Sequence, residues 1–436
     1  MTLNREILRL AVPALGALVA EPAFLMVDAA LVGHLGTVPL AGLGIASAVL
    51  QTIVGLMVFL AYSTTPAVAR RFGAGEHKDA VSIGIDGMWL ALGLGAVLAA
   101  IGALSSPWLV SLFGATADVA EHADTYLMIS MWGLPAMLIV FAATGLLRGM
   151  QDTVTPLWIA GLGFGANALL NFLFIYGFGW GIAGSAIGTV TAQWAMVAAY
   201  VVIVGRLARK HSASVRPQRE GVRGSARSGG WLFLRTVSLR VALLITVGVA
   251  TGLGTQELAG WQVVFTIFSA AAFALDALAI AAQALIGKGL GAGDIPAVRH
   301  VLARTVAWGA WFGVIVGVII GALSGVIGLA FTGDPALAAM IQPALIVLAV
   351  AQPVAGIVFV LDGVLMGSGD VRYLALAGAL NLVPFLPALL IIAMTGVSGT
   401  AGVTWLSVAF FGVYMLARFA TLGWRVKTGG WLRSSV

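Results

Sequence analysis

Residues 135–152 read PAMLIVFAATGLLRGMQD, and residues 353–370, which lie 218 positions later, read PVAGIVFVLDGVLMGSGD. The second stretch repeats the proline, the Ile-Val-Phe triplet and the closing glycines, leucine and aspartate of the first. The same offset aligns further pairs without a gap: Leu35-Gly36-Thr37 with Leu253-Gly254-Thr255, Gly73-Ala74-Gly75 with Gly291-Ala292-Gly293, and Ala183-Gly184 with Ala401-Gly402. One offset along the whole chain indicates an internal duplication. Duplicated halves in a membrane chain are typical of secondary transporters, with the substrate path between the halves.

The composition is that of an integral membrane protein. Hydrophobic residues make up 60% of the 436 residues and charged residues 9%, whereas soluble proteins carry about 25% charged residues. Lipid offers the backbone no hydrogen-bond partner, so a spanning chain forms helices or a closed barrel. Long apolar runs such as 10–32 favour helices, and the alternating ten-residue strands of a barrel are absent from the sequence. We therefore expect an all-α integral membrane protein.

Each half contains six apolar spans, each at or above the ~20 residues that cross a bilayer. The expected spans are 7–33, 38–64, 79–104, 121–147, 155–177, 184–206, 231–252, 257–286, 300–324, 335–366, 371–395 and 400–424. The sequence thus predicts twelve transmembrane helices in two repeated six-helix lobes, residues 1–206 and 231–436. A polar, basic segment rich in Ser and Gly, residues 207–230, is expected to link them on the cytoplasmic side.

The basic residues indicate how the chain is oriented. With twelve spans, every Lys and Arg except Arg240 falls at one side of the membrane. Arg235 and Arg418, which lie within expected spans, are counted here with the basic residues that flank those spans. The opposite loops contain acidic residues instead, such as Asp118. By the positive-inside rule, we expect both termini in the cytoplasm and the protein in the plasma or inner membrane. The net charge of +6 is then a topology signal, so no nucleic-acid partner is expected.

Ionisable residues at membrane depth are costly and are candidates for function. The acidic candidates are Glu21, Asp28, Asp276 and Asp362, and the basic candidate is Arg240. For Arg240 we expect a structural ion pair with Asp276, Asp362 or Glu21. The chain has no cysteine, and its histidines show no metal-ligand spacing, so we expect neither a cofactor, a structural metal nor enzymatic chemistry.

One group of polar residues lies at a common depth. Asp28, Asn171 and Thr189 each lie five or six residues from the outer end of their span, or ~8–9 Å at 1.5 Å per residue. Asn167 lies one turn deeper than Asn171 on the same face. A carboxylate, two amides and a hydroxyl at one level suit a proton or a small hard cation such as Na⁺ at Asp28 and Asn171. Alternatively, the neutral members only hold helices together by hydrogen bonds.

Pro22 lies between Glu21 and Asp28 in the first span. Since proline lacks the backbone N–H, the helix can bend there, and Pro22 is either a hinge or a static kink. Under the repeat, Asp28 corresponds to Thr246, and Asp362 corresponds to Thr144. The carboxylates therefore break the internal symmetry.

These features resemble the multidrug and toxic compound extrusion (MATE) family over nearly the whole chain. The resemblance rests on Val27-Asp28 before Gly33-His34-Leu35-Gly36, on 147–153 (LRGMQDT), and on Asn171 before 181–186 (GIAGSA). Glu21-Pro22 and 361–365 (LDGVL) are similar to the DinF-like branch. The resemblance implies two six-helix lobes with alternating access. It also implies a cation network at Asp28, Asn167, Asn171 and Thr189. Relatives commonly carry Asp where Asn171 stands.

The resemblance further implies antiport, in which a small organic compound, cationic or amphipathic, leaves as H⁺ or Na⁺ enters. The expected partners are thus this substrate, the ion and the lipid bilayer, and we expect a monomer. The alternative in the same superfamily is a flippase for a lipid-linked precursor, which would need basic groups for its pyrophosphate.

The orientation can be tested with single-cysteine variants, because the chain has no native cysteine. A membrane-impermeant thiol reagent should label Ser225→Cys only from the cytoplasm and Asp118→Cys only from outside. The reverse pattern of labelling would overturn the topology.

Overall fold

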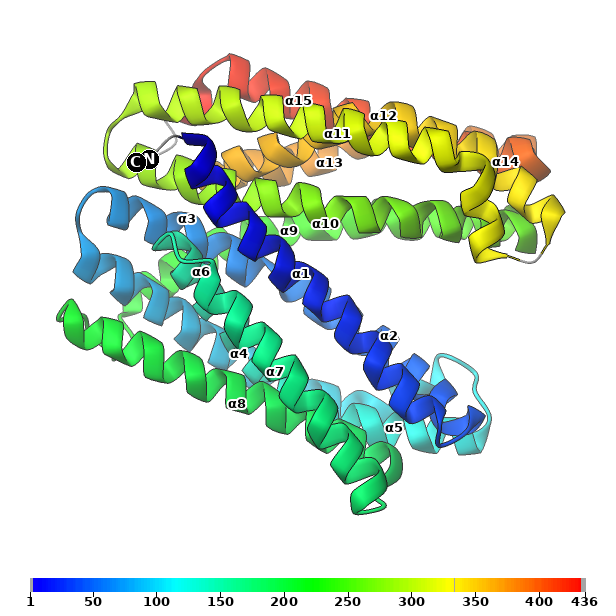
Figure 1. The fold of residues 1–436 in the computed structure, drawn as a ribbon, viewed down its shortest axis with the longest axis horizontal. Helices are drawn as coiled ribbons and strands as arrows, with labels where there is room; N and C mark the ends of the chain where they lie inside the picture. The colour runs from blue at the N-terminus through cyan, green and yellow to red at the C-terminus, as the bar shows by residue number, and fades with distance from the viewer. Residues whose placement is uncertain (1–2, 333, 433–436) are drawn as a thin grey trace. The chain divides into compact units, whose positions relative to one another are not determined.

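A computed structural model describes residues 3–332 and 334–432, with the exception of the side chain of Glu21. Within this part of the chain, twelve helices or helix groups are long and apolar enough to cross a membrane. The predicted all-α fold with twelve spans is therefore confirmed (Figure 1). Most helices extend several residues beyond the predicted ends, because hydropathy locates the apolar centre of a helix and misses its polar first and last turns.

The spans of the first half are α1 (Leu3–Gly33), α2 (Thr37–Met57) with α3 (Phe59–Gly73), α4 (His77–Ser111), α5 (Ala117–Ser130) with η1 (Met131–Gly133) and α6 (Leu134–Gly149), α7 (Val154–Phe172) with η2 (Leu173–Gly177), and α8 (Gly181–Lys210). Those of the second half are α9 (Arg219–Leu253), α10 (Thr255–Gly291), α11 (Ile295–Phe331), α12 (Pro335–Gly367), α13 (Val371–Thr395), and α14 (Gly399–Ser407) with η3 (Val408–Tyr414) and α15 (Met415–Lys427). A short turn, η4 (Gly430–Leu432), follows.

Contacts divide the chain into two compact units. The N-unit is Val12–Gly229, and the C-unit contains the described residues up to Ala11 and from Gly230 onward. The first turns of α1 belong to the C-unit, where Lys288 Nζ lies 3.1 Å from Glu6 Oε1. Helices α8 and α9 run into the expected linker, so only residues 211–218 of it lie outside helices. The lobe boundaries stay a prediction.

The helix packing repeats at the same offset as the sequence. A Cβ added to Gly95 would lie 2.5 Å from Pro135 Cα, and one added to Gly313 would lie 2.7 Å from Pro353 Cα. Such distances are shorter than real Cβ contacts, so glycine is required where α4 meets α6 and where α11 meets α12. In Figure 1, α11 and α12 run side by side. Both units therefore use one packing scheme, as a duplication predicts.

Side chains outside these contacts indicate the lipid-facing surface. Large apolar side chains are exposed along the helices, among them Leu104, Trp108 and Leu380. In water such surfaces would favour aggregation, whereas in a bilayer they contact acyl chains. Inside the N-unit, Val81, Leu146 and other buried aliphatic residues pack where α3, α4, α6 and α8 meet.

Candidate functional site: a buried carboxylate in the N-unit

Asp28 is buried in the N-unit, with 3% of its surface exposed. Three neutral donors bind its carboxylate. Asn171 Nδ2 and Ser185 Oγ donate to Oδ1 at 2.8 and 2.6 Å, and the hydroxyl of Tyr126 donates to Oδ2 at 3.0 Å. Burial disfavours the charged carboxylate, and the three donors stabilise it. Because none of these donors carries a charge, the negative charge is solvated by them and is not neutralised.

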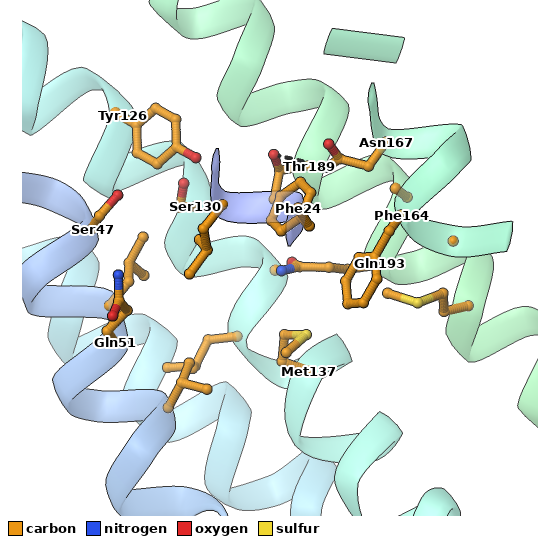
Figure 2. A pocket seen from close by; sticks show the side chains of 18 residues that line it. Phe24, Ser47, Gln51, Tyr126, Ser130, Met137, Phe164, Asn167, Thr189 and Gln193 are labelled. Carbon is orange, nitrogen blue, oxygen red and sulfur yellow. Dashed lines mark hydrogen bonds between the residues drawn. The ribbon is translucent and has the colours of Figure 1, made fainter. Parts of the chain in front are cut away.

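Asn167 and Thr189 extend the cluster by one helical turn. Asn167 Nδ2 donates to Thr189 Oγ1 at 3.0 Å (Figure 2), and Thr189 Oγ1 lies 3.5 Å from Asn171 Nδ2. The structure thus brings together Asp28, Asn171 and Thr189, which the sequence places at one depth, and Asn167, which it places one turn deeper. Among the described residues, the amide oxygens of Asn167 and Asn171 accept no hydrogen bond although both are buried. Carboxylate, amide and hydroxyl oxygens are the ligands that a hard cation prefers.

Small residues on α8 make this cluster possible. Gly184 and Gly188 lie one turn apart, as do the polar pair Ser185 and Thr189. A Cβ on Gly184 would lie 2.8 Å from the backbone carbon of Phe174, and one on Gly188 would lie 3.0 Å from the backbone nitrogen of Asn171. The glycines therefore let α8 approach the end of α7 closely enough for Ser185 and Thr189 to reach the asparagines.

A cavity of about 100 Å³ lies next to this cluster within the N-unit. Tyr126, Asn167 and Thr189 form part of its wall, and Gln51 and Gln193 carry amides elsewhere in the lining (Figure 2). Phe24 and Phe164 also line the cavity, with stacked rings whose centroids are 5.2 Å apart. Met137, Met196, Leu50 and Val54 add flexible apolar surface. The lining is therefore apolar and aromatic with a few neutral polar groups, and none of its residues is basic.

The C-unit has no equivalent of the carboxylate cluster among its described residues. At the offset of the repeat, Asp28, Tyr126, Asn167, Asn171, Ser185 and Thr189 are replaced by Thr246, Ala344, Phe385, Leu389, Val403 and Ser407. These replacements are all buried. Phe385 packs edge-on against Phe410 with ring centroids 6.0 Å apart. One copy of the ancestral unit thus has a polar centre, and the other has an aromatic and aliphatic one.

Asp362, the second buried carboxylate, has a different environment. It pairs with Arg235, and Arg418 Nη2 lies 2.5 Å from its Oδ2. At the repeat offset, Asp362 and Arg418 take the places of Thr144 and Tyr200, whose hydroxyl oxygens are 2.8 Å apart. The interpretation of Arg235 and Arg418 as flanking topology charges is therefore wrong, because both side chains are nearly buried and neutralise Asp362.

The remaining candidates lie outside both clusters. Arg240 is exposed on α9, and its suggested pairing with Asp362 is wrong because Asp362 is held by the two other arginines. Asp276 is half-buried within α10. The side chain of Glu21 lies outside the described structure, so its suggested pairing with Arg240 stays a prediction. Helix α1 continues through Pro22, and the hinge also stays a prediction.

Two hydrogen-bond donors to Asp28, Tyr126 and Ser185, were not predicted from the sequence. The signal for Ser185 is its spacing of four residues from Thr189 on a face that also carries two glycines. Tyr126 offers no such signal. It lies in α5 close to the acidic residues Glu121 and Asp124 of the same helix, and only the tertiary fold brings its hydroxyl to Asp28.

The close approach at Gly188 gives a test of this geometry. Gly188→Ala should displace Asn171 and cost about 1–3 kcal/mol of stability by overpacking, so the melting temperature of the purified protein should fall. Gly165→Ala, on α7, is the control because no heavy atom lies within 4 Å of the added Cβ. Equal melting temperatures for the two variants would contradict the proposed packing.

Comparisons with known proteins agree with this architecture. The MatE family model matches residues 13–173 and 233–391, one segment in each repeat. Protein DETOXIFICATION 44, chloroplastic, from Arabidopsis thaliana is 29% identical over 98% of this chain and 84% of its own length. DNA damage-inducible protein F of Escherichia coli is 26% identical over 67% of this chain and 64% of its own length.

Among solved structures, the Vibrio cholerae MATE transporter VcmN in the bent form has the same fold. Its TM-score is 0.88 at 21% sequence identity, over 99% of this chain and 97% of that chain. The DinF-like branch stays a prediction, because the resemblance to DNA damage-inducible protein F covers less of the chain than the resemblance to the plant protein. The matched segments cover well over half of the chain, and the chain therefore belongs to the MatE family of membrane transporters.

Proposed function

We propose that this protein is a secondary antiporter that exports small organic compounds, cationic or amphipathic, in exchange for protons, with Asp28 as the coupling carboxylate. The observation that carries the proposal is that Asp28 is buried and bound only by neutral donors. A carboxylate of this kind changes its net charge when it takes up a proton, and that change alters the cost of keeping it buried. Asp362 is held by two guanidinium groups, so its charge is already compensated.

The choice of proton over sodium rests on the charge of the cluster. Asn171 is neutral, so the cluster holds one negative charge. Desolvating Na⁺ must be offset by ligand charge, and a single carboxylate offsets less than two. The oxygens of Asn167, Asn171 and Thr189 could complete a sodium shell after the amides turn, which keeps Na⁺ as the alternative ion at this site.

The lining of the N-unit cavity supports the proposed substrate class. Stacked Phe24 and Phe164, with the methionines, suit aromatic and apolar groups, and Gln51 and Gln193 can bind polar substituents. A cationic substrate in this cavity would also be attracted by the negative charge of Asp28, which is hydrogen-bonded to the lining residue Tyr126. A flippase for lipid-linked pyrophosphates would need basic groups, and none of the residues that line this cavity is basic.

In the proposed cycle, the two lobes alternate the opening of the substrate path, and Pro22 is the hinge of span one. Protonation of Asp28 would weaken its attraction for a cationic substrate and favour substrate release outside. The proposal includes cytoplasmic termini, the plasma or inner membrane, a monomer and membership of the DinF-like branch. The resemblance of 361–365 to that branch supports the last point.

A cationic dye serves as the test substrate. In proteoliposomes, Asp28→Asn should abolish the efflux of this dye that a pH gradient drives, because the amide cannot take up the proton. Part of the dye binding should remain. Asp79→Asn, which changes an exposed carboxylate, is the matched control and should transport as the wild type does. Asn171→Asp should make efflux sensitive to sodium by adding a second charge. Wild-type efflux by Asp28→Asn under a proton gradient would refute the proposal.

Asp362→Asn should lower stability more than it alters coupling. It leaves two buried guanidinium groups without a counter-charge, at a cost of about 3–5 kcal/mol, so the melting temperature should fall. In the fraction of the protein that remains folded, the number of protons exchanged per dye molecule transported should equal the wild-type value.

A matched control takes its residues from the first repeat, where Thr144, Ala17 and Tyr200 occupy the equivalent positions. The triple substitution Asp362→Thr, Arg235→Ala and Arg418→Tyr removes all three charges and should destabilise less than Asp362→Asn does. If Asp362→Asn uncouples transport and Asp28→Asn does not, the coupling site lies in the C-unit.

A further inference from the structure

A second, apolar cavity of the N-unit lies where α4 and α8 meet the segment that precedes α9. Its volume is about 360 Å³. The side chains of α4 that line it recur at positions i, i+3, i+4 and i+7, so they form one face of that helix. The lining residues of α8 recur at i, i+4, i+7 and i+8 and also share one face. Its lining includes Met88, Trp89, Leu92, Val197, Val201 and Val215. No charged side chain lines this groove, and it is separate from the cavity beside Asp28.

Two hydrogen bonds hold the segment 211–218, which connects α8 to α9, at one end of this groove. The indole nitrogen of Trp89 donates to the carbonyl oxygen of Val215 at 3.0 Å. Three residues later, the backbone nitrogen of Gln218 donates to Asp86 Oδ1 at 2.7 Å. Asp86 is buried at 1% exposure and lies against the N-terminal end of α9, whose helix dipole favours a negative charge. The two tethers fix the backbone on both sides of Arg216.

Exposed arginines lie at the same end of the groove. Val197, Val201, Gly205 and Arg209 are spaced by four residues, so Arg209 continues the groove-lining stripe of α8 by one turn. Arg216 directly follows Val215 in the tethered segment. Both side chains are exposed, and neither forms an ion pair with a described residue. The ring of Trp89 lines the groove, and its N–H donates to the backbone of the polar segment. Tryptophan side chains at a membrane interface combine apolar and polar contacts in the same way.

We propose that this groove binds an anionic phospholipid, with an acyl chain between α4 and α8 and the phosphate headgroup at Arg209 and Arg216. The groove supplies an apolar lining whose side chains Trp89 and Val201 are exposed, and the arginines supply the complementary charge at its polar end. Basic residues next to a membrane span attract anionic lipids. This inference is independent of the transported substrate and of the coupling ion.

The test uses single-cysteine variants that carry a bimane label, which is quenched by lipids with brominated acyl chains. Val201→Cys places the label in the groove, and Val202→Cys is the matched control. The two residues are adjacent on α8 and are exposed to 53% and 52%, and only Val201 lines the groove. The full-length protein is reconstituted in vesicles in which brominated phosphatidylglycerol or brominated phosphatidylcholine replaces part of an unbrominated phosphatidylcholine background.

We expect phosphatidylglycerol to occupy the site at Val201→Cys at least about fivefold more tightly than phosphatidylcholine, since each basic residue strengthens the attraction about fivefold. At Val202→Cys the two lipids should quench equally. When Arg209→Gln and Arg216→Gln are added, the ratio of phosphatidylglycerol to phosphatidylcholine affinity measured at Val201→Cys should fall to about one. Arg223→Gln with Arg227→Gln, which removes two exposed arginines from α9, should leave it unchanged.

Three results would overturn the proposal. Equal quenching by the two lipids at Val201→Cys would mean that the groove holds zwitterionic lipid equally well. An equal preference at Val201→Cys and Val202→Cys would mean that anionic lipid is enriched around the whole helix. Loss of the preference on removing Arg223 and Arg227 would mean that the attraction comes from the diffuse charge of the region and not from this site.

Discussion

A carboxylate buried at membrane depth must be compensated by the protein, and the kind of compensation decides what the carboxylate can do. Asp28 is compensated by hydrogen bonds from Asn171, Ser185 and Tyr126, all of them neutral. Asp362 is compensated by two guanidinium groups. Removing the charge of Asp362 would leave two buried guanidinium groups without a counter-charge, whereas removing the charge of Asp28 would leave no cation unpaired. Both residues are buried carboxylates, and this difference in compensation is the reason why we propose Asp28, and not Asp362, as the coupling residue.

The duplication explains how one unit could acquire this centre without loss of the fold. The close contacts of Gly95 with Pro135 recur between Gly313 and Pro353, so the helix packing does not depend on which side chains fill the centre. In the C-unit the corresponding space is filled by Phe385, whose ring packs against the rings of Phe410 and Tyr414. In the N-unit the glycines of α8 bring backbones together and leave the centre to hydroxyls and amides. Among the described residues, the polar centre occurs in the N-unit only, and this is consistent with coupling in one lobe alone.

Much of this could be predicted from the sequence. The spans follow from hydropathy, and the level shared by Asp28, Asn171 and Thr189 follows from the constant rise of a helix. The partners of Asp362 could not be predicted in that way. Arg235 lies inside the expected span 231–252 but close to its first residue, so it is counted with the basic residues of the linker, whereas α9 already begins at Arg219. Tyr126 was missed for another reason, since its contact with Asp28 joins two helices that are far apart in the chain.

The central claim is that one carboxylate, Asp28, serves both the proton and the substrate. Linkage requires that a substrate which prefers the unprotonated form displaces protons from those molecules in which Asp28 is protonated before binding, so the release is measured over a range of pH that includes such molecules. This release is measured by titrating a cationic dye into the purified protein by calorimetry, in buffers that differ in their heat of ionisation. We expect the wild-type protein to release protons when it binds the dye, and Asp28→Asn to bind the dye without releasing protons. Equal proton release by both proteins would contradict the central claim.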